Sequence, residues 1–238
     1  MPAVHLEVEK KYRADDAFEL PPLGELVLRD GDGSPAVGDG GSPVAEGELV
    51  DQHLTATYFD TADLQLAAAG LTLRRRTGGD DAGWHLKVPA AGGARSEVRL
   101  PLGRGPRTAV PGPLKRMLRV RTRGAPLHPV AEITTDRTVR RLVDATGRVL
   151  AEVADDRVSA RRLVTAGDAG VAGAAESWRE IEVELVDGTA ELLDAVDARL
   201  RGRGLEPAVE TSKVARLLGD ARSRSAEGAG RRHQKVSA

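Results

Sequence analysis

Charged and apolar residues alternate along several short segments of this chain, and this alternation limits the folds open to it. In 4–13, VHLEVEKKYR, the side chains of Glu7, Glu9 and Lys11 share one face of a strand, because successive side chains point to opposite sides. In 180–185, EIEVEL, three glutamates alternate with Ile, Val and Leu in the same way. A helix would scatter these charges around its circumference, so the pattern predicts β-strands.

The charges also segregate by segment. The two segments above are acidic, whereas 71–76, LTLRRR, and 84–88, WHLKV, carry Arg74, Arg76 and Lys87 on their polar faces. One interpretation is that every such face is solvated. However, a solvated surface usually intersperses its signs, and the glutamates of one strand lie only about 7 Å apart. We therefore favour a barrel with its charged faces turned inward around a wet cavity that holds ions, because unpaired buried charge is prohibitive.

The remaining segments complete a mainly β, α+β architecture. We expect further strands and helices between Gly-rich turns, two low-complexity loops and a C-terminal tail without apolar periodicity. The predicted fold is a closed eight-stranded antiparallel β-barrel with flanking helices, formed by residues 1–218 as one domain, with a disordered tail at 219–238. The expected strands are 53–61, 95–102, 129–143 and 148–158; the helices are 112–123, 189–201 and 211–218, with a short one after Asp60 or Thr61; the loops are 30–47 and 166–176.

Composition excludes several classes of protein. The 238 residues include no cysteine, which removes disulfides, thiolate metal sites and thiol nucleophiles. The net charge of −1 argues against a general attraction to nucleic acid or to a membrane surface. Since no apolar run approaches the roughly 20 residues of a membrane helix, we expect a cytoplasmic protein, either a monomer or a homodimer.

Six short sequence blocks, taken in the order in which they occur along the chain, resemble those of the CYTH superfamily, also called triphosphate tunnel metalloenzymes. The resemblance runs over essentially residues 4–218 and implies an eight-stranded tunnel that binds a linear triphosphate together with one or two Mg²⁺ or Mn²⁺ ions. The blocks are E-x-E-x-K at 7–11, TYFDT at 57–61, LTLRRR at 71–76, WHLK at 84–87, EIEVEL at 180–185 and TSK at 211–213.

The resemblance also implies roles for individual residues. Glu180 and Glu182 are expected on the side of the metal and the attacking water, and Lys11 is expected beside the reacting phosphate. Hard divalent cations prefer carboxylate oxygens, and phosphoryl transfer requires neutralisation of charge. The implied metal ligands are Glu7, Glu9, Asp156, Glu180 and Glu182; the implied phosphate-binding cations are Lys11, Arg74, Arg76, Lys87, Arg137 and Lys213.

One segment departs from the family pattern. Members often show R-x-E-x-E where this chain has Arg95, Glu97 and Arg99, so a base replaces the last acid. Glu184 lies in phase with the candidate ligands, and it either serves the site or pairs with an arginine. Trp84 and Trp178 are expected to face outward as core residues.

Several functions share this set of residues. We expect a metal-dependent triphosphatase acting on inorganic triphosphate or a related small triphosphate, or on polyphosphate. The alternatives are a polyphosphate- or nucleotide-binding module with little turnover, a thiamine triphosphatase and a class IV-type adenylate cyclase. Both acidic strands are present, and this favours an enzyme over a binder of anions, which has no need of the carboxylates.

Overall fold

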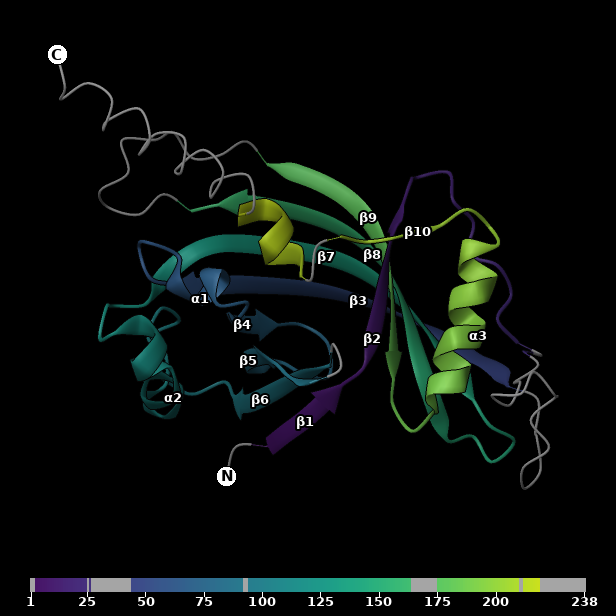
Figure 1. Ribbon diagram of the computed structural model, residues 1–238, viewed down its shortest axis with the longest axis horizontal. Coiled ribbons are helices and arrows are strands. Elements are labelled where there is room, and N and C mark those ends of the chain that lie inside the picture. Colours follow the sequence, from purple (N-terminus) through teal and green to yellow (C-terminus); the bar gives the residue numbers. More distant parts are fainter. Residues whose placement is uncertain are drawn as a thin grey trace, which may run out of the picture.

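A single antiparallel sheet dominates the computed structural model, which describes residues 3–24, 26, 44–91, 94–163, 175–209 and 212–218. Across these residues the strand order is β1-β6-β5-β4-β3-β7-β8-β9-β2-β10, and the sheet curls into a half-barrel (Figure 1). The strands are β1 (Ala3–Glu7), β2 (Glu9–Ala14), β3 (Ala45–Asp60), β4 (Thr72–Thr77), β5 (Gly83–Pro89), β6 (Arg95–Pro101), β7 (His128–Val143), β8 (Val149–Arg162), β9 (Glu176–Leu185) and β10 (Glu206–Pro207). The predicted mainly β class is thus confirmed.

The N-terminal segment joins the two sides of the curled sheet. Strand β1 pairs with β6, whereas β2 pairs with β9, and only Val8 separates β1 from β2. The Val8 carbonyl oxygen accepts a hydrogen bond of 3.0 Å from the Leu185 N–H at the end of β9. This one segment therefore carries Glu7 and Glu9 between the basic and the acidic sides of the sheet. Full closure into an eight-stranded barrel stays a prediction.

Apolar side chains pack on the outer side of the sheet, as the alternation predicts. Helix α3 (Ala190–Arg201) covers β2, β8 and β9 with Leu192, Val196 and Leu200, which are all buried. Helix α2 (Gly112–Thr122) packs on an apolar cluster from β3 to β6, in which the rings of Phe59 and Trp84 have centroids 5.0 Å apart. Figure 1 shows these two helices at opposite ends of the molecule. Because each large apolar side chain stabilises the fold by about 1.5–3 kcal/mol when buried, these two clusters on the outer side of the sheet form a large part of the core.

The short helix α1 (Gln65–Ala68) starts as its neighbours predict, with one correction. Its N-cap position is Leu64, not Asp60 or Thr61. The carboxylate of Asp60 nevertheless accepts hydrogen bonds from the N–H groups of Leu66 and Ala67, at 2.8 and 2.9 Å. The Thr61 hydroxyl accepts one from Gln65 N–H at 3.0 Å. Side chains further upstream thus satisfy the free N–H groups of the first turn.

The prediction of a loop at 30–47 is wrong at the C-terminal end of this range. Strand β3 begins at Ala45, eight residues before the predicted strand, and Ala45 pairs with Val143 of β7. The glycine and glutamates at its start lack apolar alternation, so only the pairing with β7 makes this part extended. The remainder of that loop, most of the 166–176 loop and the 219–238 tail lie outside the described residues.

The other predicted elements are found within one to four residues. The predicted helices at 112–123 and 189–201 correspond to α2 and α3, and residues 213–218 of the third helix are helical. Among the described helices, none has both the length and the apolar character that a membrane span requires.

Candidate functional site

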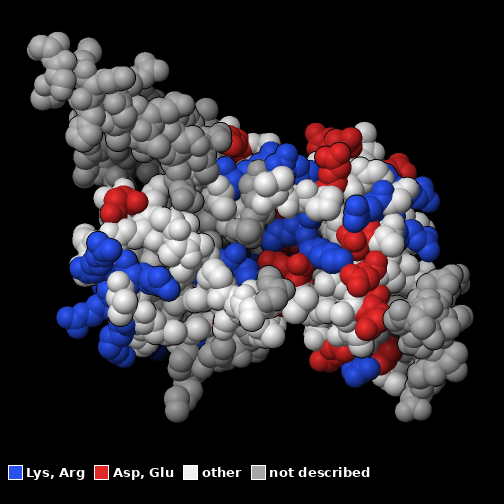
Figure 2. Space-filling view, in the orientation of Figure 1, with Lys and Arg blue, Asp and Glu red and all other residues white. Residues whose placement is uncertain are grey.

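The charged faces of the strands line a common cavity of about 430 Å³. Lys and Arg side chains gather beside Asp and Glu side chains in the middle of the face shown in Figure 2. The predicted inward orientation of the charged faces is therefore found in the structure. The lining residues include Glu7, Glu9, Lys11, Arg74, Arg76, Lys87, Arg99, Arg137, Glu182, Glu184 and Lys213.

Arginines of β4 form a cationic wall. Arg74 and Arg76 point into the cavity, and the Nε atom of each is buried without a hydrogen-bond partner. Burial, together with the nearby charges of Arg74 and Arg137, lowers the pKa of Arg76 to about 9. The guanidinium of Arg76 pairs with Asp81 in the β4–β5 turn. Positive charges that crowd one another and keep unused donors are suited to binding an anion with several oxygens.

Three carboxylates meet on the other side, where β8 and β9 run side by side. Asp156, Glu180 and Glu182 each offer an oxygen within 4.8 Å of the others, and all three side chains are buried. Asp156 and Glu180 are direct cross-strand partners, and Glu182 lies two residues further along the same face. Within the described part of the chain, these three acidic side chains are close enough together to hold a metal ion.

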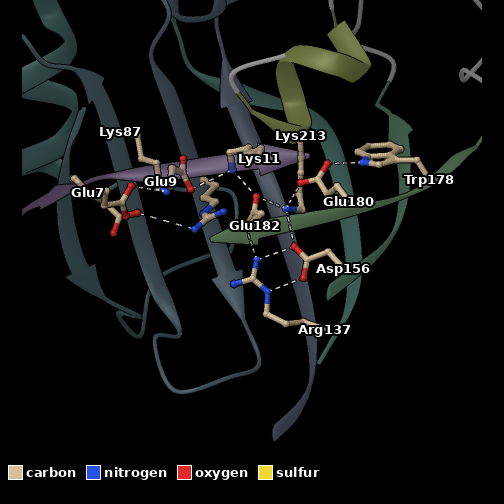
Figure 3. Close-up of polar contacts among 12 residues, drawn as sticks. Glu7, Glu9, Lys11, Lys87, Arg137, Asp156, Trp178, Glu180, Glu182 and Lys213 are labelled. Carbon is tan, nitrogen blue, oxygen red and sulfur yellow. Dashed lines mark hydrogen bonds and ion pairs between the residues drawn. The ribbon is translucent and has the colours of Figure 1, made fainter. Parts of the chain in front are cut away.

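Cations already surround this acidic cluster (Asp156, Glu180 and Glu182), as Figure 3 shows. The Nζ of Lys213 lies 2.8 Å from Asp156, 2.6 Å from Glu180 and 2.7 Å from Glu182. Lys11 pairs with Glu182, and its Nζ is 3.2 Å from Glu9. The three carboxylates suit Mg²⁺ or Mn²⁺ in their chemistry, so the residues fit such an ion. In this structure, the ammonium groups of Lys213 and Lys11 contact carboxylate oxygens of the cluster.

Arg137 of β7 completes the cluster. Its Nε and Nη2 donate to the two oxygens of Asp156 at 2.7 Å each, and Nη2 also donates to Glu182 at 2.6 Å. Although burial opposes its charge, these carboxylates raise the pKa of Arg137 above its ordinary value. Arg137 therefore stays charged and faces both the acidic cluster and the cavity.

The pKa values of Glu180 and Glu182 are shifted in opposite directions. Burial would raise the pKa of Glu182, but Lys11, Lys213 and Arg137 outweigh it and hold this pKa well below the usual range. Burial and the charge of Glu182 raise the pKa of Glu180, in spite of Lys213. Glu180 also accepts a hydrogen bond of 2.6 Å from the Trp178 indole N–H. Glu182 is thus a fixed anion, and Glu180 is the easier carboxylate to protonate.

Glu7 lies apart from this cluster, at the side of the basic strands, whereas Glu9 of β2 contacts Lys11, which in turn pairs with Glu182. Glu7 is buried, with one oxygen 2.6 Å from Lys87 Nζ and the other 3.5 Å from Arg99 Nη2. Burial, and the nearby Glu97, raise the pKa of Glu7. Of the five implied metal ligands, the structure therefore brings Asp156, Glu180 and Glu182 together in the acidic cluster. Glu9 is linked to the cluster through Lys11, and Glu7 pairs with Lys87 on the basic side.

Two further acids lie at or beside the cavity, although the alternation pattern predicts no definite role for them. Glu97 is fully buried and contacts His85 at 2.9 Å and Arg99, while its distance to Arg74 is 4.0 Å. Glu184 lines the cavity, and burial together with the charge of Glu7 raises its pKa to about 7. Their phase with neighbouring charged residues was the available signal, but phase alone does not distinguish a site residue from an ion-pair partner.

Trp84 lies as expected, but the expectation that Trp178 faces outward is wrong. Trp84 is buried in the core under α2, and Trp178 is partly buried beside the 213–218 helix. Trp178 lies two residues before Glu180 on β9 and therefore on the same face of the sheet, where its indole N–H contacts Glu180 of the acidic cluster.

Comparisons with known proteins identify relatives of this chain. Two curated proteins of Mycobacterium tuberculosis, MT2285 of strain CDC 1551 / Oshkosh and Rv2226 of strain ATCC 25618 / H37Rv, are each 42% identical over 225 residues. The match covers 92% of this chain and 41% of each relative, so the chain spans about two fifths of their length.

Solved structures with a similar arrangement include bh2851 of Bacillus halodurans, at 16% identity and a TM-score of 0.48, covering 90% of this chain and 97% of that one. HpAC1 of Hippeastrum, described as having a dominant triphosphatase activity, matches at 15% identity and a TM-score of 0.45, covering 90% and 96%. The CYTH domain family model matches residues 45–216, which include the basic wall, Arg137 and the whole acidic cluster. This chain belongs to the CYTH domain family.

Proposed function

We propose that this chain hydrolyses a linear triphosphate, inorganic triphosphate or a small relative of it, with Mg²⁺ or Mn²⁺ bound in its cavity. The observation that supports the proposal is a cavity lined by Arg74 and Arg76 of β4, which have unused buried donors, and by Glu182 of the acidic cluster. A polyanion that carries divalent cations matches both kinds of side chain at once. Closure of the sheet into an eight-stranded barrel is part of this proposal, because it would enclose the anion on all sides.

In this proposal, the residues of the cavity have different roles. Arg74, Arg76 and Lys87 hold phosphate oxygens, and Arg137 and Lys11 approach from the acidic side. A divalent ion at the acidic cluster would neutralise phosphate charge and would lower the pKa of a water molecule. Glu180, the carboxylate with the raised pKa, is placed to hold or release a proton, and Glu182 stays ionised.

A binding module with little turnover is the second candidate, and one observation favours it. Lys213, Arg137, Lys11 and Trp178 already contact the oxygens of the acidic cluster, as would suit a site without metal. Thiamine triphosphatase and adenylate cyclase activities remain alternatives that a choice of substrates separates.

A panel assay tests the proposal. Inorganic triphosphate, ATP, thiamine triphosphate and long polyphosphate are each incubated with Mg²⁺ or Mn²⁺, and released phosphate and cyclic AMP are measured. We expect metal-dependent release of phosphate from a triphosphate. Cyclic AMP from ATP would instead identify a cyclase, and binding without turnover on all four would identify the binding module.

Variants connect any activity to the cavity. Glu9→Gln and Glu182→Gln are expected to lower hydrolysis by about a hundredfold or more, a typical loss when one electrostatic contact is removed from an active site. Glu176→Gln, on the same strand as Glu182 but exposed, is the matched control and should keep full activity. Full activity of both site variants would refute the placement of the reaction in this cavity.

A further inference from the structure

Lys213 sits where a divalent cation would sit. Its ammonium lies 2.6–2.8 Å from one oxygen of each of the three acids in the cluster, and its side chain is buried. Three carboxylate contacts around one nitrogen are the arrangement expected of a small cation. The acidic cluster therefore contains its own counter-ion, supplied by the chain.

The cluster has no carboxylate oxygen to spare while Lys213 is there. Arg137 donates hydrogen bonds to both carboxylate oxygens of Asp156. Trp178 and Lys213 each donate to one carboxylate oxygen of Glu180. In Glu182, Lys11 and Lys213 share one oxygen while Arg137 holds the other. Mg²⁺ or Mn²⁺ requires oxygens at about 2.0–2.2 Å, and a divalent ion so close to an ammonium would be strongly repelled. Lys213 and the ion cannot both occupy the cluster.

The backbone that carries Lys213 is firmly anchored. The helical residues 213–218 bury Val214, Leu217 and Leu218 against the sheet, and Arg162 donates to the Leu217 carbonyl oxygen at 2.6 and 3.1 Å. The guanidinium of Arg216 lies 4.6 Å from the centroid of the Trp178 ring. The ammonium is thus presented to the cluster by a fixed element. However, Lys213 also lines the cavity, so its flexible four-carbon stem can swing the charge away from the carboxylates.

We infer that Lys213 and a divalent cation are alternative occupants of the cluster formed by Asp156, Glu180 and Glu182, so that Lys213 limits how tightly the metal binds. The inference rests on the proposed function only for the identity of the metal. It predicts that the chain without Lys213 binds a divalent cation more tightly than the native chain does.

Mn²⁺ titration of the full chain provides the test. The indole N–H of Trp178 contacts Glu180, so Mn²⁺ in the cluster should quench its fluorescence, while Trp84 in the separate core under α2 contributes a constant signal. Free Mn²⁺ is counted in parallel by electron paramagnetic resonance. The variants are Lys213→Met and Lys213→Gln, with Lys115→Met, an exposed lysine on α2, as the control.

We expect the Kd for Mn²⁺ to fall at least about tenfold in both Lys213 variants and to stay at the native value in Lys115→Met, because the competing charge is removed only in the former. Equal affinities in the native and Lys213 chains, or no quenching in the variants at millimolar Mn²⁺, would overturn the inference. If a Lys213 variant is unfolded in chelator, Mn²⁺ should restore its folding, and failure to do so also overturns it. Since no triphosphate is present, tighter binding of Mn²⁺ without any hydrolysis in the panel assay would refute the proposed function alone.

Discussion

Arg137 and Asp156 are direct cross-strand neighbours on β7 and β8, and their side chains form two parallel hydrogen bonds of 2.7 Å. This bidentate pair lies at the junction between the cationic wall and the acidic cluster. Asp156 is fully buried, and burial would raise its pKa if Lys213 and Arg137 did not hold it below the ordinary value. The pair therefore holds the Arg137 guanidinium in one orientation, in which it can contact a phosphate, and it keeps the Asp156 carboxylate ionised.

Asp156→Asn is expected to destabilise the fold. The substitution leaves the buried charges of Arg137 and Lys213 facing a neutral amide, and breaking a buried pair on one side costs about 3–5 kcal/mol. Urea unfolding of the metal-free protein measures this free energy. The control is Asp187→Asn, an exposed position after β9. A loss no larger than that of the control would contradict a structural role for the pair.

Arg76→Gln is expected to weaken the binding of inorganic triphosphate by about tenfold or more, because a hydrogen bond to a charged group contributes about 1.5–3 kcal/mol. Calorimetric titration without metal measures binding independently of turnover. The arginine run provides its own control: Arg75 points to the opposite face of β4 and is absent from the described lining of the cavity. Equal losses in Arg75→Gln and Arg76→Gln would show that the cavity is not the anion site.

Glu184 should make stability depend on pH. Its pKa is raised from 4.5 to about 7, first by burial and then by the charge of Glu7, so its ionisation is harder in the folded than in the unfolded chain. Its contribution to stability is full below pH 4.5 and is lost as the pH rises through 7.

As the pH rises from 4.5 through about 7, we expect the native chain to lose about 1–3 kcal/mol of unfolding free energy relative to Glu184→Gln. Urea unfolding across this range in the presence of a chelator measures the difference. Glu176→Gln should follow the native curve, whereas a Glu184→Gln curve parallel to the native one would show that the pKa is not raised.

Asp60→Ala should destabilise the chain by about 1–3 kcal/mol. The carboxylate accepts hydrogen bonds from three backbone N–H groups, those of Thr61, Leu66 and Ala67, and its removal leaves buried donors unsatisfied. Thermal unfolding detects the loss. Asp63→Ala, at a more exposed carboxylate near the same helix, is the comparison, and an equal or larger effect there would contradict the capping role of Asp60.

The sheet and the inward direction of the charges follow from local sequence. A period of two in a strand fixes which side chains share a face, so Glu7, Glu9, Arg74 and Arg76 could be assigned to a charged interior from a few residues each. The helices α2 and α3 are equally predictable, because the spacing of their apolar residues is also a property of neighbouring positions in the sequence. The start of β3 was missed because it becomes extended only through pairing with β7, nearly a hundred residues away.

Local alternation thus predicts most of the strands, the face that each charge occupies and the kinds of ligand that such faces suit. Which acid contacts which base depends instead on tertiary contacts. The register of β7, β8 and β9 joins Arg137 to Asp156, and the packing of residues 213–218 brings Lys213 into the acidic cluster. The physical reason is that an ion pair acts over a few ångströms, whereas the distance between residues 156 and 213 along the chain sets no distance between them in space.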